Sequence, residues 1–202
     1  NEIQARIKIY SHRDSVVIYP PVDTSRFQPA AEVEDYFLVL SRLIPYKRID
    51  LAVQAATRLG VPLKVGGKGR DLERLKAMAG PTVEFLGYVP DEQLPGLMAR
   101  CKALIFPGLE DFGIVPVQAQ AAGRPVIAFG GGGALDTVIP GKTGEWFHEM
   151  TVDALASVMA NFDPARYDPQ AIRAHALRFD TAVFNREITA FVEQAWAAFA
   201  LR

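Results

Sequence analysis

Apolar and polar residues are arranged in blocks along the chain, with short apolar runs separated by longer segments that repeat apolar residues at helical spacing. The runs read YFLVLS, PLKVGG, VEFLG, ALIFPG and PVIAF, and each precedes a helical segment such as RIDLAVQAATRL or DEQLPGLMAR. Short runs of this kind are typical of strands buried on both faces of a sheet. Strands and helices that take turns predict right-handed crossover connections. We therefore predict an α/β fold with a doubly wound parallel sheet.

The two ends of the chain differ from the middle. Residues 1–14 carry Ile3, Ile7 and Tyr10 at helical spacing, and residues 181–202 carry a longer apolar stripe. The stripe contains Phe184, Ile188, Phe191, Val192, Ala195, Trp196 and Phe199. We expect a ligand-binding domain over residues 15–180, preceded by a linker helix or the remnant of another domain. The C-terminal helix is expected either to pack back on its own domain or to face a second one.

The amino-acid composition limits the kinds of partner that this protein can bind. The chain has 202 residues, of which 50% are hydrophobic, and a formal net charge of −1. This balance suits a globular domain with a sizeable core and argues against a protein that wraps nucleic acid. Cys101 is the only cysteine, which excludes a disulfide framework within the chain and favours a reducing compartment.

Targeting signals are not visible in the sequence. No apolar run approaches the roughly 18 to 20 residues of a membrane span, and the first residues, NEIQARIKIYSHRD, lack the apolar core of a signal peptide. We expect a cytoplasmic protein and leave open a peripheral association with a membrane.

Four loops follow predicted strands and carry polar or glycine-rich sequences. They read RLIPYKR, GGKGR, GLEDFG and GGGGA. In a doubly wound sheet, ligands lie beyond the carboxyl ends of the strands, so these loops are expected to meet at one edge and to form the binding site.

The glycine motifs match known phosphate-binding loops only in part. GGKGRDL follows a strand and opens a helix as a dinucleotide fingerprint would, but the third glycine position is occupied by Leu72. PGKTG resembles the end of a P-loop, yet Asp136 stands where the first glycine is required. Gly130 to Gly133 precede a predicted helix, where bare amide groups and the helix start favour a close approach by an oxyanion, and a tight strand-to-helix turn without a ligand is the alternative.

Positive charge is concentrated in the first loop. Arg42 and Lys47 bracket a proline before the helix that begins near Ile49. A guanidinium fork and an ammonium group that converge at a strand end fit a diphosphate, although ordinary surface charge is the alternative.

The segment EDFGIVPVQ places Glu110 in a loop and Gln118 in the following helix. Pro116 suits the first turn of a helix that ends at Gly123, so Gln118 is expected near the third helical position. Glu110 and Gln118 would then contact different parts of one elongated ligand. Alternatively, Gln118 is a capping-box residue that bonds back to the helix start.

These segments together resemble the C-terminal domain of the family 4 retaining glycosyltransferases, which have the GT-B fold and use nucleotide sugars. The resemblance rests on SRLIPYKRID, VEFLGYVPDEQL and EDFGIVPVQAQAAGRPVIA, in this order and spacing. It implies that the sheet is Rossmann-like and forms the C-terminal half of a GT-B enzyme.

The resemblance also implies roles for individual positions. Arg42 and Lys47 match the pair that binds the donor diphosphate and stabilises the leaving nucleotide, and Glu110 matches the glutamate that orients the donor sugar. These three are the predicted catalytic residues. The predicted donor-binding residues are Gly67, Tyr88, Val89, Phe112, Gly113, Ile114 and Gln118. No cofactor and no metal site are expected, since the chain contains no Asp-x-Asp pair.

Two departures from the family pattern qualify this prediction. Gln118 stands where the family has a glutamate that grips the ribose, and a neutral acceptor loses about 1 kcal/mol of charge-assisted bonding, close to a tenfold weakening. We expect residues 1–14 to be the tail of the family's acceptor-binding domain. A missing N-terminal domain or a partner chain is therefore the expected partner, besides the nucleotide-sugar donor.

The predicted function is transfer of a hexosyl group, with retention, from GDP-mannose to an unknown acceptor in glycan, lipopolysaccharide or glycolipid synthesis. A UDP-glucose-dependent transferase, a nicotinamide-dependent oxidoreductase and a non-catalytic interaction module are the alternatives.

Overall fold

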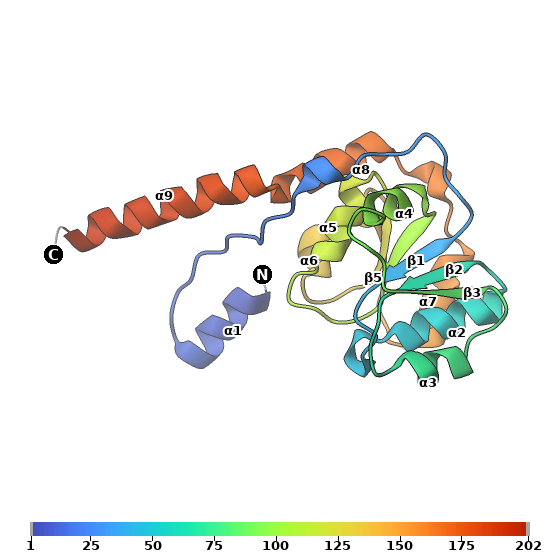
Figure 1. Ribbon diagram of the computed structural model, residues 1–202. Helices are drawn as coiled ribbons and strands as arrows, with labels where there is room; N and C mark the ends of the chain where they lie inside the picture. The colour runs from blue at the N-terminus through green and yellow to red at the C-terminus, as the bar shows by residue number, and fades with distance from the viewer. Residues whose placement is uncertain (1, 201–202) are drawn as a thin grey trace.

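Six parallel strands form one twisted sheet at the centre of the computed structural model, which describes residues 2–200 (Figure 1). The strands are β1 (Phe37–Leu40), β2 (Leu63–Gly66), β3 (Val83–Gly87), β4 (Ala103–Phe106), β5 (Val126–Phe129) and β6 (Gly144–Phe147). Their order in the sheet is β3-β2-β1-β4-β5-β6. From β1, the strands β2 and β3 are added on one side of the sheet, and β4, β5 and β6 are added on the other, as in a doubly wound fold. The predicted fold class is confirmed.

Helices cover both faces of this sheet. They are α2 (Ile49–Leu59), α3 (Leu72–Ala77), α4 (Leu94–Arg100), α5 (Ile114–Ala121), α6 (Ala134–Thr137), α7 (Val152–Ala160) and α8 (Pro169–Ala176). Single turns of 3₁₀ helix occur at η1 (Thr24–Arg26), η2 (Pro45–Lys47), η3 (Pro164–Arg166) and η4 (Leu177–Phe179). In Figure 1, α2, α3 and α7 lie on one side of the sheet, and α4, α5 and α8 on the other.

The strands alternate their side chains between two cores. Phe37 and Val39 of β1 pack with α2 and α7, whereas Leu38 and Leu40 pack with α4 and α5. All four side chains are buried, so this strand reads as a continuous apolar run instead of an alternating one. The two apolar cores hold the sheet rigid and thereby fix the positions at which the loops leave its carboxyl edge.

The helix that follows Glu110 begins earlier than the sequence predicts. Gly113, at φ 89°, precedes Ile114, the first residue of α5, so Pro116 is its third residue and Gln118 its fifth. Proline is tolerated there because amides of the first helical turn have no partner within the helix. The helix ends at Ala121, and Gly123 follows its C-cap at φ 73°, close to the end that the sequence predicts.

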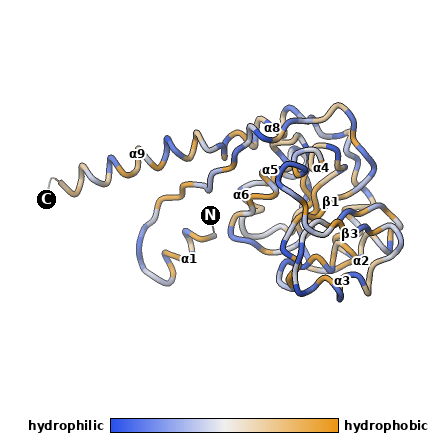
Figure 2. The backbone as a smooth tube through the Cα atoms, in the orientation of Figure 1, coloured by the Kyte–Doolittle hydropathy of each residue, from blue (hydrophilic) through white to orange (hydrophobic). Residues whose placement is uncertain are grey.

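The C-terminal helix lies apart from the main domain. α9 (Thr181–Ala200) extends away from it, and none of its residues is buried (Figure 1). Figure 2 shows apolar positions along this helix. Its aromatic side chains Trp196 and Phe199 are both 69% exposed. Within residues 2–200, no helix combines the length and the hydropathy that crossing a bilayer would require.

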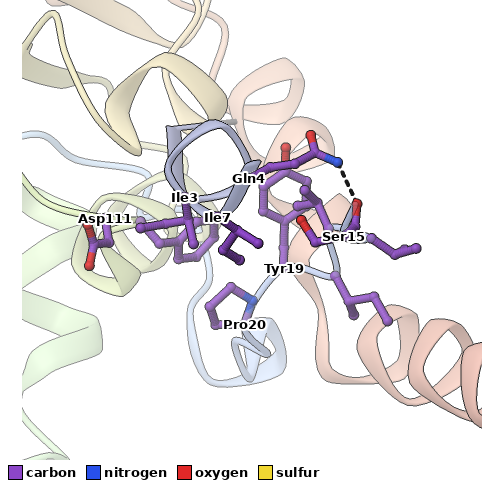
Figure 3. A pocket seen from close by; sticks show the side chains of 11 residues that line it. Ile3, Gln4, Ile7, Ser15, Tyr19, Pro20 and Asp111 are labelled. Carbon is purple, nitrogen blue, oxygen red and sulfur yellow. Dashed lines mark hydrogen bonds between the residues drawn. The ribbon is translucent and has the colours of Figure 1, made fainter. Parts of the chain in front are cut away.

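Helix α1 (Glu2–Ser11) lies beside the loop that contains Glu110. The Nη1 atom of Arg6 is 3.3 Å from Oδ1 of Asp111, and the amide of Gln4 donates to the carbonyl of Ser15 over 2.7 Å. A cavity of about 250 Å³ lies between α1 and the domain, and Ile3 and Ile7 line it on the helix side (Figure 3). The region before residue 15 is thus in contact with the predicted site loop.

Candidate functional site

The loops after β1 and β2 are joined by backbone hydrogen bonds at the carboxyl edge of the sheet. Leu43 N donates to Lys68 O over 2.9 Å, and Asp71 N donates to Leu43 O over 3.0 Å. The carboxylate of Asp71 is held by the guanidinium of Arg74, whose hydrogen bonds lower the pKa of Asp71 below its ordinary value. These contacts fix the position of the two loops relative to each other.

The two loops can pack this closely because Gly67 and Gly69 have no Cβ atom. A Cβ atom at Gly67 would lie 1.8 Å from the carbonyl oxygen of Ser41, and one at Gly69 would lie 2.1 Å from that of Leu43. Gly67 also has φ 131°, a conformation that L side chains rarely adopt. Contact with the neighbouring loop is therefore sufficient to explain the glycine at position 67.

A cavity of about 350 Å³ opens beside this loop pair. It is lined by Leu40, Ser41, Arg42, Gly66, Gly67, Lys68, Tyr88, Val89, Leu94, Met98, Val115 and Gln118. Five predicted site residues thus meet in one hollow, contributed by the ends of β1, β2 and β3 and by α5. Arg42 and Lys68 supply two positive charges, and the side chains from β1, α4 and α5 supply an apolar floor.

Lys68 is a cation of this cavity that the sequence analysis did not select. Its Nζ atom lies 5.7 Å from the ring centroid of Tyr88, which is 64% exposed. The sequence signal for Lys68 is its place within GGKGR, the loop that follows a predicted strand. A second cavity, of about 540 Å³, also contains Tyr88 and Val89 and adds Glu92 and Arg100. The hollow therefore continues past the tyrosine ring toward α4.

Lys47 and Glu110 form an ion pair next to this cavity. Lys47 ends η2, and Glu110 lies in the loop between β4 and α5; their side chains are 17% and 18% exposed. Gly108 allows the two loops to approach, because a Cβ atom there would lie 3.0 Å from the carbonyl oxygen of Lys47. The two residues do not line the 350 Å³ cavity with Arg42.

Tyr46 connects the two predicted phosphate-binding cations. Its hydroxyl accepts a hydrogen bond from Nη2 of Arg42 over 3.3 Å, and its ring centroid lies 5.2 Å from Nζ of Lys47. The side chains of Arg42, Tyr46, Lys47 and Glu110 consequently form a continuous series of contacts from the cavity to the acidic loop. The sequence analysis did not select Tyr46, because nothing in its sequence position indicates these contacts.

Phe112, Gly113 and Ile114 lie outside the 350 Å³ cavity. The ring of Phe112 stacks on Tyr19 at a centroid distance of 5.5 Å and meets the edge of Phe179 at 5.5 Å. Gly113 and Ile114 form the start of α5, where backbone amides lack partners within the helix. The phenyl ring of Phe112 thus packs into an aromatic cluster, whereas the side chain of Ile114 is 45% exposed.

The glycine-rich segment after β5 packs against the Glu110 loop. Gly133 N donates to Glu110 O over 2.8 Å, and Cβ atoms at Gly132 and Gly133 would lie 2.2 Å from Glu110 O and from Phe112 Cα. Packing against this loop therefore requires glycine at positions 132 and 133, and the predicted oxyanion site stays a prediction. α6, which follows, has four residues.

Gln118 faces the cavity from the fifth position of α5. A capping-box residue stands at the third helical position, which is Pro116 here, and the start of α5 has no side-chain cap. The capping alternative for Gln118 is therefore wrong.

Among the residues from 2 to 200, no three histidine, cysteine or acidic side chains gather in a way that could hold a metal ion.

Known proteins share parts of this sequence and the fold. Residues 22–162 match the family model described as glycosyl transferases group 1. A GDP-mannose-dependent α-(1-6)-phosphatidylinositol monomannoside mannosyltransferase of Mycolicibacterium smegmatis is 35% identical over 73% of this chain and 47% of its own length. An α-1,3/1,6-mannosyltransferase of Dictyostelium discoideum is 48% identical over 61% of this chain and 36% of its own.

Other similar proteins carry different names. A D-inositol 3-phosphate glycosyltransferase of Nocardia farcinica is 29% identical over 90% of this chain and 48% of its own length. The chain thus spans at most about half the length of these curated relatives. Among solved structures, sucrose-phosphate synthase of Thermosynechococcus elongatus matches 98% of this chain and 57% of its own, with a TM-score of 0.85 at 24% identity. This match supports the GT-B assignment of the fold.

Proposed function

Since this chain belongs to the glycosyl transferases group 1 family, we propose that it forms the donor-binding domain of a retaining hexosyltransferase that uses GDP-mannose. The family membership favours this function over the oxidoreductase and the non-catalytic module. The missing third glycine at Leu72 points the same way, because it breaks the dinucleotide fingerprint.

The observation that carries the proposal is the shared cavity of Arg42, Lys68, Tyr88 and Gln118 at the carboxyl edge of the sheet. Its volume of about 350 Å³ lies within the range of small-molecule sites. Two cations suit a diphosphate, an exposed aromatic ring suits a nucleobase, and an amide side chain suits ribose hydroxyls. These groups are arranged along one continuous hollow, which fits an elongated nucleotide.

Lys47 and Glu110 are proposed to act on the sugar end of the donor. As the bond between the sugar and the diphosphate breaks, negative charge develops on the departing phosphate, and fixed cations lower the energy of that state. Arg42 and Lys47 would stabilise the leaving group, and Glu110 would orient sugar hydroxyls. The ammonium group of Lys47 has three hydrogens, so it can keep its contact with Glu110 and donate to a phosphate at the same time.

The proposed donor follows from the similarity to the Mycolicibacterium smegmatis mannosyltransferase, which is named as GDP-mannose-dependent. A UDP-glucose donor is the alternative, and we propose no acceptor. No metal or cofactor enters the proposed mechanism. The cytoplasmic location and the peripheral membrane association stay predictions.

We propose that a second domain, in the same protein or in a partner chain, supplies the acceptor site. The exposed apolar side chains of α9 and α1, such as Trp196 and Ile9, support this proposal because they leave apolar surface available for contact. The cleft where transfer occurs would then lie between the Glu110 loop and that domain.

Calorimetry with GDP, UDP and ADP tests the proposed function on the 202-residue chain. We expect saturable binding of GDP in preference to UDP and ADP, and about tenfold or greater weakening on Arg42→Ala. Lys142→Ala is the matched control, because Lys142 is exposed in the turn before β6, at the opposite end of that strand from the cavity. Absence of binding to all three nucleotides, or equal loss in both variants, would contradict the proposal.

A further inference from the structure

Tyr46 is an exposed aromatic residue whose position is not explained by the hydrophobic core. It is 55% exposed and lies in η2, between the proline that starts this turn and Lys47. Large apolar rings gain little from such a position, because most of their surface remains in water. The contacts of the side chain offer another explanation for a tyrosine at this position.

The two ends of the Tyr46 side chain contact different cations. The hydroxyl oxygen accepts from Arg42 at 3.3 Å, and Nζ of Lys47 is 5.2 Å from the ring centroid, within the range of a cation–π interaction. We propose that Tyr46 is a positioning residue that sets the spacing of these two cations for a diphosphate. This inference rests on the proposed function of the site.

The chemistry of a phenol suits this task. Two like charges repel, and both side chains have several rotatable bonds, so without a shared neighbour they would sample many separations. A carboxylate between them would hold both but would also cancel part of their charge. A neutral ring with a hydroxyl contacts both cations and leaves their charge available to the ligand.

The surroundings make Lys47 the fixed end of this arrangement. Its ammonium contacts Glu110, and its backbone packs against Gly108, so η2 is anchored on the neighbouring loop. Arg42, by contrast, lines the open cavity. The Tyr46 hydroxyl thus ties the more exposed cation to the anchored one.

A diphosphate and a monophosphate should respond differently to the loss of this tie. Two phosphates that engage both cations require their spacing to be set, whereas a single phosphate can be bound by one cation. We therefore expect Tyr46→Phe to weaken GDP binding about three- to tenfold, which corresponds to one hydrogen bond, and to change GMP binding less than twofold. Tyr46→Leu also removes the ring contact and should weaken GDP binding further, by about another two- to fivefold.

Calorimetric titration of the wild-type chain and both variants with GDP and with GMP tests this inference. Tyr10→Phe is the matched control, because Tyr10 is 80% exposed on α1 and outside both cavities near the cations. The thermal unfolding temperature without nucleotide should be the same for all four proteins. A merely structural role would instead lower this temperature or weaken GDP and GMP binding equally, and either result would overturn the inference.

The failure of the proposed function would look different. If the wild-type chain bound no nucleoside diphosphate, the donor-site proposal and the role of Tyr46 would both be wrong. If the wild-type chain bound GDP and Tyr46→Phe bound it equally well, only the role of Tyr46 would be wrong.

Discussion

Lys47 and Glu110 form an ion pair across two loops, with both side chains less than one fifth exposed. The pair couples the cation expected to bind a phosphate to the carboxylate expected to bind the sugar. Part of the positive charge of Lys47 is therefore compensated by Glu110. Nucleotide affinity should depend on this compensation in a direction that substitution can test.

Removal of the carboxylate charge should strengthen the binding of free nucleotide. Glu110→Gln leaves Lys47 without its anionic partner, so we expect GDP to bind about three- to tenfold more tightly at low salt. Lys47→Met should weaken GDP binding by about tenfold or more, because it removes a charge-assisted hydrogen bond. Calorimetry at two salt concentrations measures both effects.

Asp111→Asn is the control for this pair of variants. It removes a carboxylate one residue away that contacts Arg6 and is 71% exposed. We expect its affinity for GDP to stay within twofold of the wild type. Equal gains from Glu110→Gln and Asp111→Asn would show that general charge, and not the Lys47 contact, controls affinity.

Restoring the acid at the second position of the EDFGIVPVQ motif should strengthen donor binding. Gln118→Glu places a carboxylate at the cavity wall, where it can accept charge-assisted hydrogen bonds from ribose hydroxyls, and about tenfold tighter GDP binding is expected. Gln170→Glu, on the exposed start of α8, controls for the added charge. The ribose assignment is wrong if Gln118→Glu binds GDP equally or less well.

The role of Gly67 can be separated from ligand binding by measuring stability. Gly67→Ala puts a Cβ atom 1.8 Å from the Ser41 carbonyl oxygen, so we expect the free energy of unfolding to fall by about 3 kcal/mol. Gly141→Ala is the control: Gly141 has φ 71° but open space around it, so about 1 kcal/mol is expected. Denaturant unfolding without nucleotide measures both. Similar losses in the two variants would mean that the β1 and β2 loops are not packed as described.

Stability should also depend on pH through His175. This half-buried side chain on α8 has Nε2 at 3.1 Å from Thr137 O, and burial, followed by the charge of Arg178, lowers its pKa below the ordinary 6.5. The unfolded chain therefore takes up a proton more readily, so the free energy of unfolding should decrease as the pH falls through 6.5. His175→Gln should reduce that slope, whereas His148→Gln, at an exposed position, should not. Identical slopes in all three proteins would rule out this coupling.

The fold was largely predictable because its strands are apolar on both faces. All five apolar runs became strands, whereas β6 was missed because GEWF mixes a glycine, an acid and two aromatic residues. The start of α5 differs from the prediction because Pro116 is acceptable anywhere in the first turn, whereas Gly113 sets the boundary.

The candidate site was predictable to the level of loops. Topology alone brings the loops after β1, β2 and β4 to one edge, which places Arg42, Gly67 and Glu110 in the same region. The pairing of Lys47 with Glu110, and the two contacts of Tyr46, depend on side-chain rotamers and on the approach allowed by Gly108. Such contacts leave no periodic signal in the sequence.

The most direct test of the account is a crystal structure of the chain with bound GDP. We predict that the diphosphate lies within hydrogen-bond distance of both Arg42 and Lys47, with the ribose beside Gln118 and the base beyond Tyr88. A nucleotide bound elsewhere, for example in the hollow between Glu145 and Arg166, or a diphosphate that contacts neither cation, would contradict the account.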